Sequence, residues 1–233
     1  MEKDRQLAGY IKQKIKKTKS QPSFVPRHLE TTAGRENKKL KSQNLEVRLE
    51  VIEGDVLKVD LGNILEGNYK IVSNLPYQIT SPILWRFLNE EENKPKEMVL
   101  MVQKEVADRI LAKPGQMNLL AVLCQFYANC ELVTKVGRGS FWPVPAVDSA
   151  VVKLTLNNKN VEALNQFDEK MFFKIVKAGF ANKRKMLKNN LAKFLCCEPG
   201  VAENELKQIG LGGKIRAQEL LVDNWIELMR RLV

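Results

Sequence analysis

The sequence predicts an α/β protein whose C-terminal part is entirely helical. Between residues 49 and 156, short apolar runs alternate with amphipathic helical patterns, which is typical of a parallel-rich sheet covered by helices. Beyond Asn160 the pattern is wholly helical. The polar run at residues 157–160 separates the two patterns. We therefore expect a segment at residues 1–48, an α/β domain at 49–157 and a small helical domain at 158–233.

The individual strands and helices are predicted from hydrophobic periodicity and from the turn-forming residues between them. Strands are predicted at residues 49–53, 69–73, 97–102, 131–137 and 149–156. Helices are predicted at residues 81–89, 104–111, 119–127, 168–180, 182–194, 202–209 and 216–231. Asp168 is the expected N-cap of its helix, and Gly210 with Gly212 and Gly213 breaks the chain before the last helix.

Charge points to a polyanionic partner. The net charge is +11, and residues 1–48 hold 13 Lys and Arg against 5 Asp and Glu. A second cluster, residues 170–193, has eight basic side chains and no acidic one. Each cluster could also be a solvated face, or for the first an unstructured tail. We favour RNA contact for residues 170–193.

The sequence disfavours a metal-binding protein and a membrane protein. The four cysteines, at 124, 130, 196 and 197, lack Cys-x-x-Cys spacing, and His28 is the single histidine, so no metal site is expected. No apolar run approaches the roughly 18 residues of a membrane span, and no apolar signal core follows Met1. We expect a cytoplasmic protein that does not bind membranes.

The stretch at residues 71–77, Ile-Val-Ser-Asn-Leu-Pro-Tyr, predicts a site for an amino group. A strand would carry Asn74 to its carboxyl end, where open parallel sheets bind ligands. Pro76 has no N–H and favours an extended Leu75, whose carbonyl can then accept a hydrogen bond. The Asn74 amide oxygen is a second acceptor, and the Tyr77 ring offers a face to a base. Such a site could hold an exocyclic NH₂ for methylation.

Six segments then carry a resemblance to a known family. They are residues 53–57 (Glu-Gly-Asp-Val-Leu), 74–77 (Asn-Leu-Pro-Tyr), 101–109 (Met-Val-Gln-Lys-Glu-Val-Ala-Asp-Arg), 141–152 (Phe-Trp-Pro-Val-Pro-Ala-Val-Asp-Ser-Ala-Val-Val), 180–185 (Phe-Ala-Asn-Lys-Arg-Lys) and 216–220 (Arg-Ala-Gln-Glu-Leu). With these segments the chain resembles the ribosomal RNA adenine dimethyltransferases over about residues 49 to 233. An Asn-x-Pro-aromatic motif also occurs in other amino methyltransferases, so the order of all six makes the resemblance specific.

The resemblance implies a Rossmann-like S-adenosylmethionine-dependent methyltransferase sheet. It also implies transfer of two methyl groups to the exocyclic nitrogen of adenosines near the 3′ end of small-subunit ribosomal RNA. The expected partner is this RNA or a pre-ribosomal particle, and we expect the protein to be a monomer. The implied site consists of Asn74, Leu75, Pro76 and Tyr77, with Asp55 and Asn74 contacting the cofactor; Asp55 could equally be a turn residue.

Two further groups complete the expected site. The prolines of Phe-x-Pro143-x-Pro145 stiffen the loop that holds Phe141, whose ring would face Tyr77 across a flipped adenine. Trp142 is expected to fill the core beside this loop. The cations of Lys183, Arg184 and Lys185 are expected to contact RNA phosphates without reading sequence.

The glycine-rich cofactor loop of the family is not visible, since Gly9 and Gly34 are the glycines before residue 49. We therefore expect the first strands of the sheet to be missing, direct parallel pairing of strands 49–53 and 69–73, and weak or no binding of S-adenosylmethionine. Two rival interpretations stay open. One is a catalytically impaired RNA-binding or ribosome-assembly protein, and the other is a truncated gene product.

Overall fold

The computed structural model describes residue 52 and residues 54–61, 64–65, 67–164 and 168–233. Residues 1–59 and 60–233 form two separate compact units. The basic segment 1–48 and four of the five residues of the predicted strand 49–53 lie outside the described residues. Ile52, the described member of that range, is not in a strand. The predicted pairing of residues 49–53 with 69–73 therefore stays a prediction.

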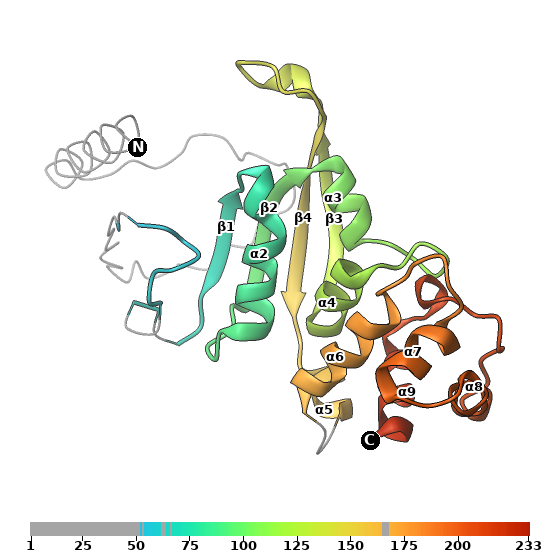
Figure 1. The fold of residues 1–233 in the computed structure, drawn as a ribbon. Helices are drawn as coiled ribbons and strands as arrows, with labels where there is room; N and C mark the ends of the chain where they lie inside the picture. Colours follow the sequence, from blue (N-terminus) through green and yellow to red (C-terminus); the bar gives the residue numbers. More distant parts are fainter. Residues whose placement is uncertain (1–51, 53, 62–63, 66, 165–167) are drawn as a thin grey trace, which may run out of the picture. The chain divides into compact units, whose positions relative to one another are not determined.

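The larger unit contains a four-stranded mixed sheet of order β1-β2-β4-β3 (Figure 1). Its strands are β1 (Lys70–Asn74), β2 (Glu97–Gln103), β3 (Ala128–Val136) and β4 (Ser149–Leu156). β1 pairs with β2 in parallel, from Lys70 opposite Glu97 to Asn74 opposite Met101. β4 lies between β2 and β3 and is antiparallel to both.

The connections explain these directions. Helix α2 (Thr80–Trp85) and the π-helical turn η2 (Arg86–Glu90) cross from β1 to β2, so the two strands run in parallel. β3 and β4 are joined by residues 137–148 without a crossing helix, so they form an antiparallel hairpin. The expectation of a parallel-rich sheet is wrong for the described strands, because β4 enters the sheet from this hairpin.

One face of the sheet forms the core. Met98, Leu100 and Val102 of β2 are fully buried, and so are Val152 and Leu154 of β4. Helices α2, α3 (Lys104–Ile110) and α4 (Leu119–Tyr127) lie over the sheet (Figure 1). The buried residues of β2 come at every second position, which is the period-2 pattern of a half-buried sheet. β1 is an edge strand of the described sheet.

The C-terminal part is helical, as predicted. It contains α5 (Lys159–Leu164), α6 (Glu169–Gly179), α7 (Leu187–Leu195), α8 (Pro199–Gln208), the 3-10 turn η4 (Ala217–Glu219) and α9 (Val222–Leu232). Asp168 caps α6, with its carboxylate accepting from Lys170 N at 2.9 Å. Both α6 and α9 contact α4, so residues 60–233 form one compact unit. The division into domains at residue 157 stays a prediction.

Aromatic side chains join α4 to α6. The Phe126 and Phe172 rings stack with centroids 4.6 Å apart. The buried Tyr127 hydroxyl donates to the Glu169 carboxylate and accepts from Asn89 Nδ2. Burial, followed by the Glu169 hydrogen bond, raises the pKa of Tyr127, so this hydroxyl stays protonated. The helical part is thereby held to the sheet layer.

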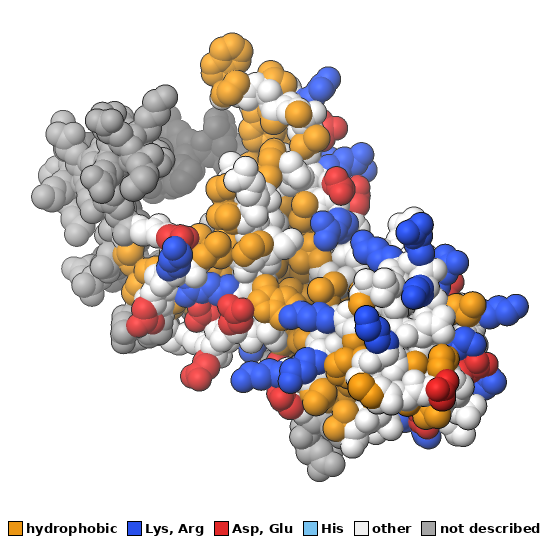
Figure 2. All heavy atoms as spheres, in the orientation of Figure 1, with side chains coloured by type: hydrophobic (Ala, Val, Ile, Leu, Met, Phe, Trp, Pro, Cys, Tyr) orange, Lys and Arg blue, Asp and Glu red, His pale blue; other side chains and the backbone are white. Residues whose placement is uncertain are grey.

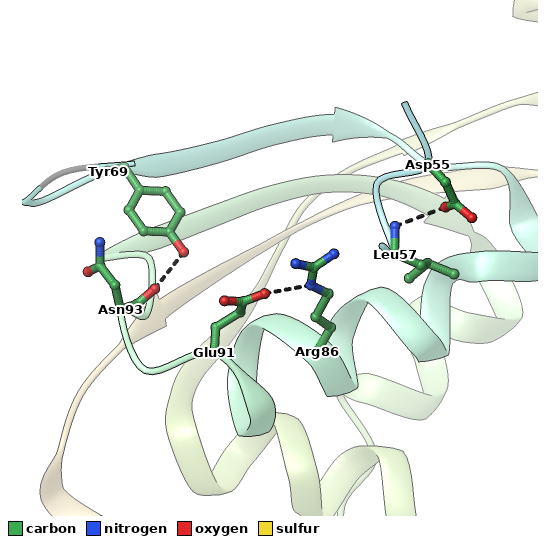
Figure 3. Close-up of polar contacts among 6 residues, drawn as sticks. All are labelled: Asp55, Leu57, Tyr69, Arg86, Glu91 and Asn93. Atoms are coloured by element: carbon green, nitrogen blue, oxygen red, sulfur yellow. Dashed lines mark hydrogen bonds and ion pairs between the residues drawn. The ribbon is translucent and has the colours of Figure 1, made fainter. Parts of the chain in front are cut away.

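Polar contacts hold the crossover that leads into β2. Tyr69 Oη donates to the Asn93 carbonyl at 2.7 Å, and Arg86 forms an ion pair with Glu91 (Figure 3). Burial raises the pKa of Tyr69, with a further contribution from the nearby Glu91 charge. The turn after η2 is therefore tied back to Tyr69, the residue before β1.

In the helical part, three boundaries differ from prediction by three residues or more. The helix expected at 182–194 begins only at Leu187, the helix expected at 202–209 begins at Pro199, and the helix expected at 216–231 is interrupted before Val222. The first difference has a clear tertiary cause. Nδ2 of the buried Asn190 in α7 donates to the carbonyls of Gly179 and Asn182, which holds residues 180–185 as a turn.

Candidate active site

A pocket of about 350 Å³ lies where β1 ends. It brings together the two segments that the sequence assigned to the target base, although Tyr77 and Phe141 are far apart in the sequence. Its lining residues come from the end of β1 and from the loop between β3 and β4: Asn74, Leu75, Pro76, Tyr77, Phe141, Trp142, Pro143 and Pro145. The predicted residues Asn74 to Tyr77 and Phe141 therefore share one cavity.

The turn after β1 is held by its backbone. Leu75 is buried, and its N–H donates to the Met101 carbonyl of β2 at 3.2 Å. Pro76 has an extended conformation, with φ −56° and ψ 131°, and its carbonyl accepts from Ile79 N. These bonds end the strand sharply and start the 3-10 turn η1 (Tyr77–Ile79). The exposed Asn74 side chain thus projects from a fixed strand end.

Tyr77 forms one wall of the pocket. Its hydroxyl and the Ser149 hydroxyl share a hydrogen bond of 3.2 Å. Ser149 is the first residue of β4 and is 1% exposed, whereas the Tyr77 side chain is 37% exposed. The hydroxyl is therefore anchored on the sheet while part of the residue stays open to solvent.

The loop at residues 137–148 forms the other wall. It begins with the 3-10 turn η3 (Arg138–Ser140) and is closed at its base by Asp148. The Asp148 carboxylate accepts from Arg138 N at 3.0 Å, and the Asp148 carbonyl accepts from Lys104 N at 3.0 Å. Phe141 follows η3 and is half-buried. The loop is therefore fastened to both the hairpin and the start of α3.

The expectation that Trp142 fills the core is wrong. Its side chain is 94% exposed, and it lines the pocket beside Phe141. Residues 137–148 project beyond the end of the β3–β4 hairpin (Figure 1), and Figure 2 shows hydrophobic side chains at the tip of this projection. Because the loop extends beyond the sheet, no core lies beneath the ring of Trp142.

Asp55 lies in the smaller unit and occupies a turn. Its Oδ1 accepts from Leu57 N at 3.0 Å (Figure 3), and its carbonyl accepts from Lys58 N and Val59 N. Lys58 forms a long, exposed ion pair with the same carboxylate at 3.9 Å. This geometry is that of a turn aspartate. A role in cofactor contact stays a prediction, since the two units are not placed relative to each other.

Lys183, Arg184 and Lys185 lie in the exposed turn between α6 and α7, not on a helix. The Asn190 hydrogen bonds described above define this turn. Lys183 also lines a cavity of about 220 Å³, together with Arg109 at the end of α3. Figure 2 shows Lys and Arg side chains gathered over the helical part of the larger unit. The turn therefore presents three cations to solvent.

The described part of the chain holds no candidate metal cluster, and two of its four free cysteines have raised pKa values. No group of three His, Cys, Asp or Glu residues there could hold a metal ion. Burial raises the pKa of the Cys124 thiol, and it raises that of Cys130 to about 12. Both thiols therefore stay protonated and inert at neutral pH. No described helix has the length and apolar character needed to cross a membrane.

A family model for ribosomal RNA adenine dimethylases matches residues 33–232. The chain belongs to the ribosomal RNA adenine dimethylase family. The match starts before residue 49, where the resemblance noted from the sequence begins, and so includes part of the basic N-terminal segment. It spans every motif segment of the sequence.

Curated and solved relatives agree with this family. The chain is 43% identical over 181 residues to a ribosomal RNA small subunit methyltransferase A of Dehalococcoides mccartyi, covering 76% of this chain and 61% of the relative. This chain therefore spans about three-fifths of that relative's length. Among solved structures, a dimethyladenosine transferase from Plasmodium falciparum superposes with a TM-score of 0.63 at 24% identity, covering 77% of this chain and 70% of that one. The 23S rRNA methyltransferase ErmE superposes with a TM-score of 0.59 at 25% identity, covering 78% and 71%. These structures support the Rossmann-like methyltransferase fold.

Sequence reasoning missed several residues that build the site. Ser149 anchors Tyr77, the Met101 carbonyl holds Leu75, and Asn190 shapes the basic turn. Ser149 and Met101 fall inside matched motif segments, and this is the signal that could have marked them. Asn190 lies outside those segments.

Proposed function

We propose that this protein transfers methyl groups from S-adenosylmethionine to the exocyclic amine of adenosines in small-subunit ribosomal RNA. The observation that carries this proposal is the pocket that joins Asn74–Tyr77 to Phe141. It combines polar acceptors with the aromatic side chains of Tyr77, Phe141 and Trp142 in a space of about 350 Å³. Membership of the family supports the same reaction.

The chain's own residues would act by positioning. The Asn74 amide oxygen and the Leu75 carbonyl would each accept one hydrogen of the adenine NH₂, which leaves the nitrogen lone pair directed away from them. The rings of Tyr77 and Phe141 would hold the base between them. An amine nucleophile needs alignment rather than an acid or base, and alignment can supply most of the rate effect.

S-adenosylmethionine, when bound, would supply the electrophilic methyl group. Asn74 and Asp55 are the described candidates to contact it, and Asp55 is exposed enough to accept from an adenine amine. The fit is partial, because the described residues contain no glycine-rich loop for the methionine part. The roles argued here therefore rest on the base pocket alone.

RNA positioning is assigned to the helical part. Lys183, Arg184 and Lys185 would contact phosphates and place the RNA without reading its sequence. We propose residues 158–233 as the docking domain, with small-subunit ribosomal RNA or a pre-ribosomal particle as partner. We further propose that the protein acts as a monomer in the cytoplasm.

A calorimetric titration with S-adenosylmethionine separates the enzyme from its rival, an impaired RNA-binding or assembly protein. Saturable micromolar binding supports the enzyme and would contradict the sequence-based expectation of weak or no binding, whereas no binding together with intact RNA affinity supports the rival. Transfer of labelled methyl groups to an RNA hairpin from the small-subunit 3′ end then tests the reaction itself. A hairpin in which the target adenosines are replaced by guanosine serves as the control.

A further inference from the structure

Trp142 is an exposed aromatic residue placed at a ligand pocket. Its side chain is 94% exposed and lines the same cavity as Tyr77 and Phe141. Val144 and Val147 of the same loop are also exposed, at 56% and 42%. Large apolar surface of this kind marks an interaction site more often than chance exposure.

The position of Trp142 restricts what it can contact. It directly follows Phe141, whose ring is assigned to one face of the target adenine. A base that is drawn out of its stack leaves its neighbours without a stacking partner on that side. Aromatic side chains provide such a partner for any base, because every base has a π-face.

We propose that Trp142 is a stacking platform for the nucleobase next to the target adenosine. This inference rests on the proposed function and deepens it, because it assigns a second base subsite at the rim of the pocket. Two observations favour a nucleobase over an aliphatic partner. The exposed group is a planar indole, and it lies beside a pocket already walled by two aromatic rings. Pro143 stiffens the backbone beside it, which reduces the entropic cost of binding.

The experiment compares RNA affinity among single variants of the full chain. Trp142→Ala should weaken binding of the small-subunit 3′ hairpin by about 5- to 150-fold, the range expected when one base–aromatic stack is removed. Trp142→Phe should recover most of that affinity. Val133→Ala is the matched control, because Val133 is an exposed apolar residue of β3 that lies outside this loop and does not line the pocket, and it should bind like the parent.

A second RNA isolates the stack. Hairpins that lack the base 5′ or 3′ of the target adenosine keep the backbone but remove the proposed partner. On the one that lacks the relevant base, Trp142→Ala and the parent should bind equally. Equal affinity of Trp142→Ala and the parent on intact RNA would overturn the proposal, as would an undiminished defect of Trp142→Ala on both abasic RNAs.

These measurements distinguish a failure of this inference from a failure of the proposed function. If the parent methylates the hairpin and Trp142→Ala has parental RNA affinity, only the platform is rejected. If the parent transfers no methyl group yet the abasic RNA cancels the Trp142→Ala defect, base recognition stands and catalysis is rejected. Equal thermal midpoints of parent and variant exclude a folding defect.

Discussion

Tyr77 and Ser149 share a hydrogen bond of 3.2 Å between their hydroxyls, although they come from opposite ends of the sheet domain's sequence. Tyr77 begins the turn after β1, and Ser149 begins β4 directly after the loop that carries Phe141. The two walls of the pocket are therefore linked through the sheet. A displacement of one wall should therefore displace the other.

Tyr77 variants separate the ring from its anchor. Tyr77→Phe keeps the ring but leaves the buried Ser149 hydroxyl without this partner, so it should lower stability by about 0.5–1.5 kcal/mol with little change in RNA affinity. Tyr77→Ala removes the stacking face and should cost about 1–3 kcal/mol of RNA binding. Fluorescence titration with the 3′ hairpin and thermal unfolding measure the two effects. Parental affinity of Tyr77→Ala would remove this residue from the base site.

Neutralising Lys183, Arg184 and Lys185 together should weaken RNA binding. The slope of log affinity against log salt should flatten by about 0.7–0.9 for each RNA phosphate that the triple variant no longer neutralises. Lys96→Gln changes an exposed cation outside both this turn and the proposed docking domain, and it should leave the slope nearly unchanged. A parental slope in the triple variant would show that the turn is only a solvated surface.

Gly179→Ala should destabilise the fold. A Cβ on Gly179 would overlap the ring of the buried Trp225 and lie 3.0 Å from Leu187 Cδ1. Overpacking of this kind costs typically about 1–3 kcal/mol. Gly200→Ala in α8 is the control, because nothing lies within 4 Å of its added Cβ, and helix propensity predicts no loss of stability there. Urea unfolding of both variants measures the contrast, and equal stability would refute this packing account.

Glu203 predicts an acid-sensitive contact between α7 and α8. Hydrogen bonds first from Lys188 and then from Lys207, with their charges, lower the pKa of Glu203 from 4.5 to about 2. A lowered folded-state pKa means that the contribution to stability is present above pH 4.5 and disappears as the pH falls toward about 2. Glu203→Gln should therefore be less stable than the parent at pH 7, with the difference shrinking across this window. A stability difference between the parent and Glu203→Gln that does not change with pH would show that the carboxylate charge contributes nothing to stability.

Local sequence signals predicted β1 and the pocket turn, because a β-branched run ending in Asn-Leu-Pro-Tyr leaves few alternatives. β1 was placed within one residue, and Asn74 is its last residue. The direction of β4 was harder to predict, because strand and helix alternation does not reveal that β3 and β4 form a hairpin. The sequence does not predict the turn at residues 180–185, because it is held by tertiary contacts: Asn190 Nδ2 donates to the Gly179 and Asn182 carbonyls, and Leu187 N donates to the Ile215 carbonyl. Trp142 is expected from the sequence to fill the core beside its loop, but the loop carries it away from the sheet and leaves it 94% exposed.

Counting the methyl groups on the target adenosines by mass spectrometry tests the central claim most directly. Unmethylated small-subunit RNA is incubated with S-adenosylmethionine and the parent, Asn74→Ala or Gln78→Ala; Gln78 is an exposed residue of the same turn that does not line the pocket. We predict dimethylated adenosine with the parent and Gln78→Ala, and loss of most methylation with Asn74→Ala at nearly unchanged RNA affinity. Equal methylation by Asn74→Ala and the parent, or none by a parent that binds the RNA, would contradict the account.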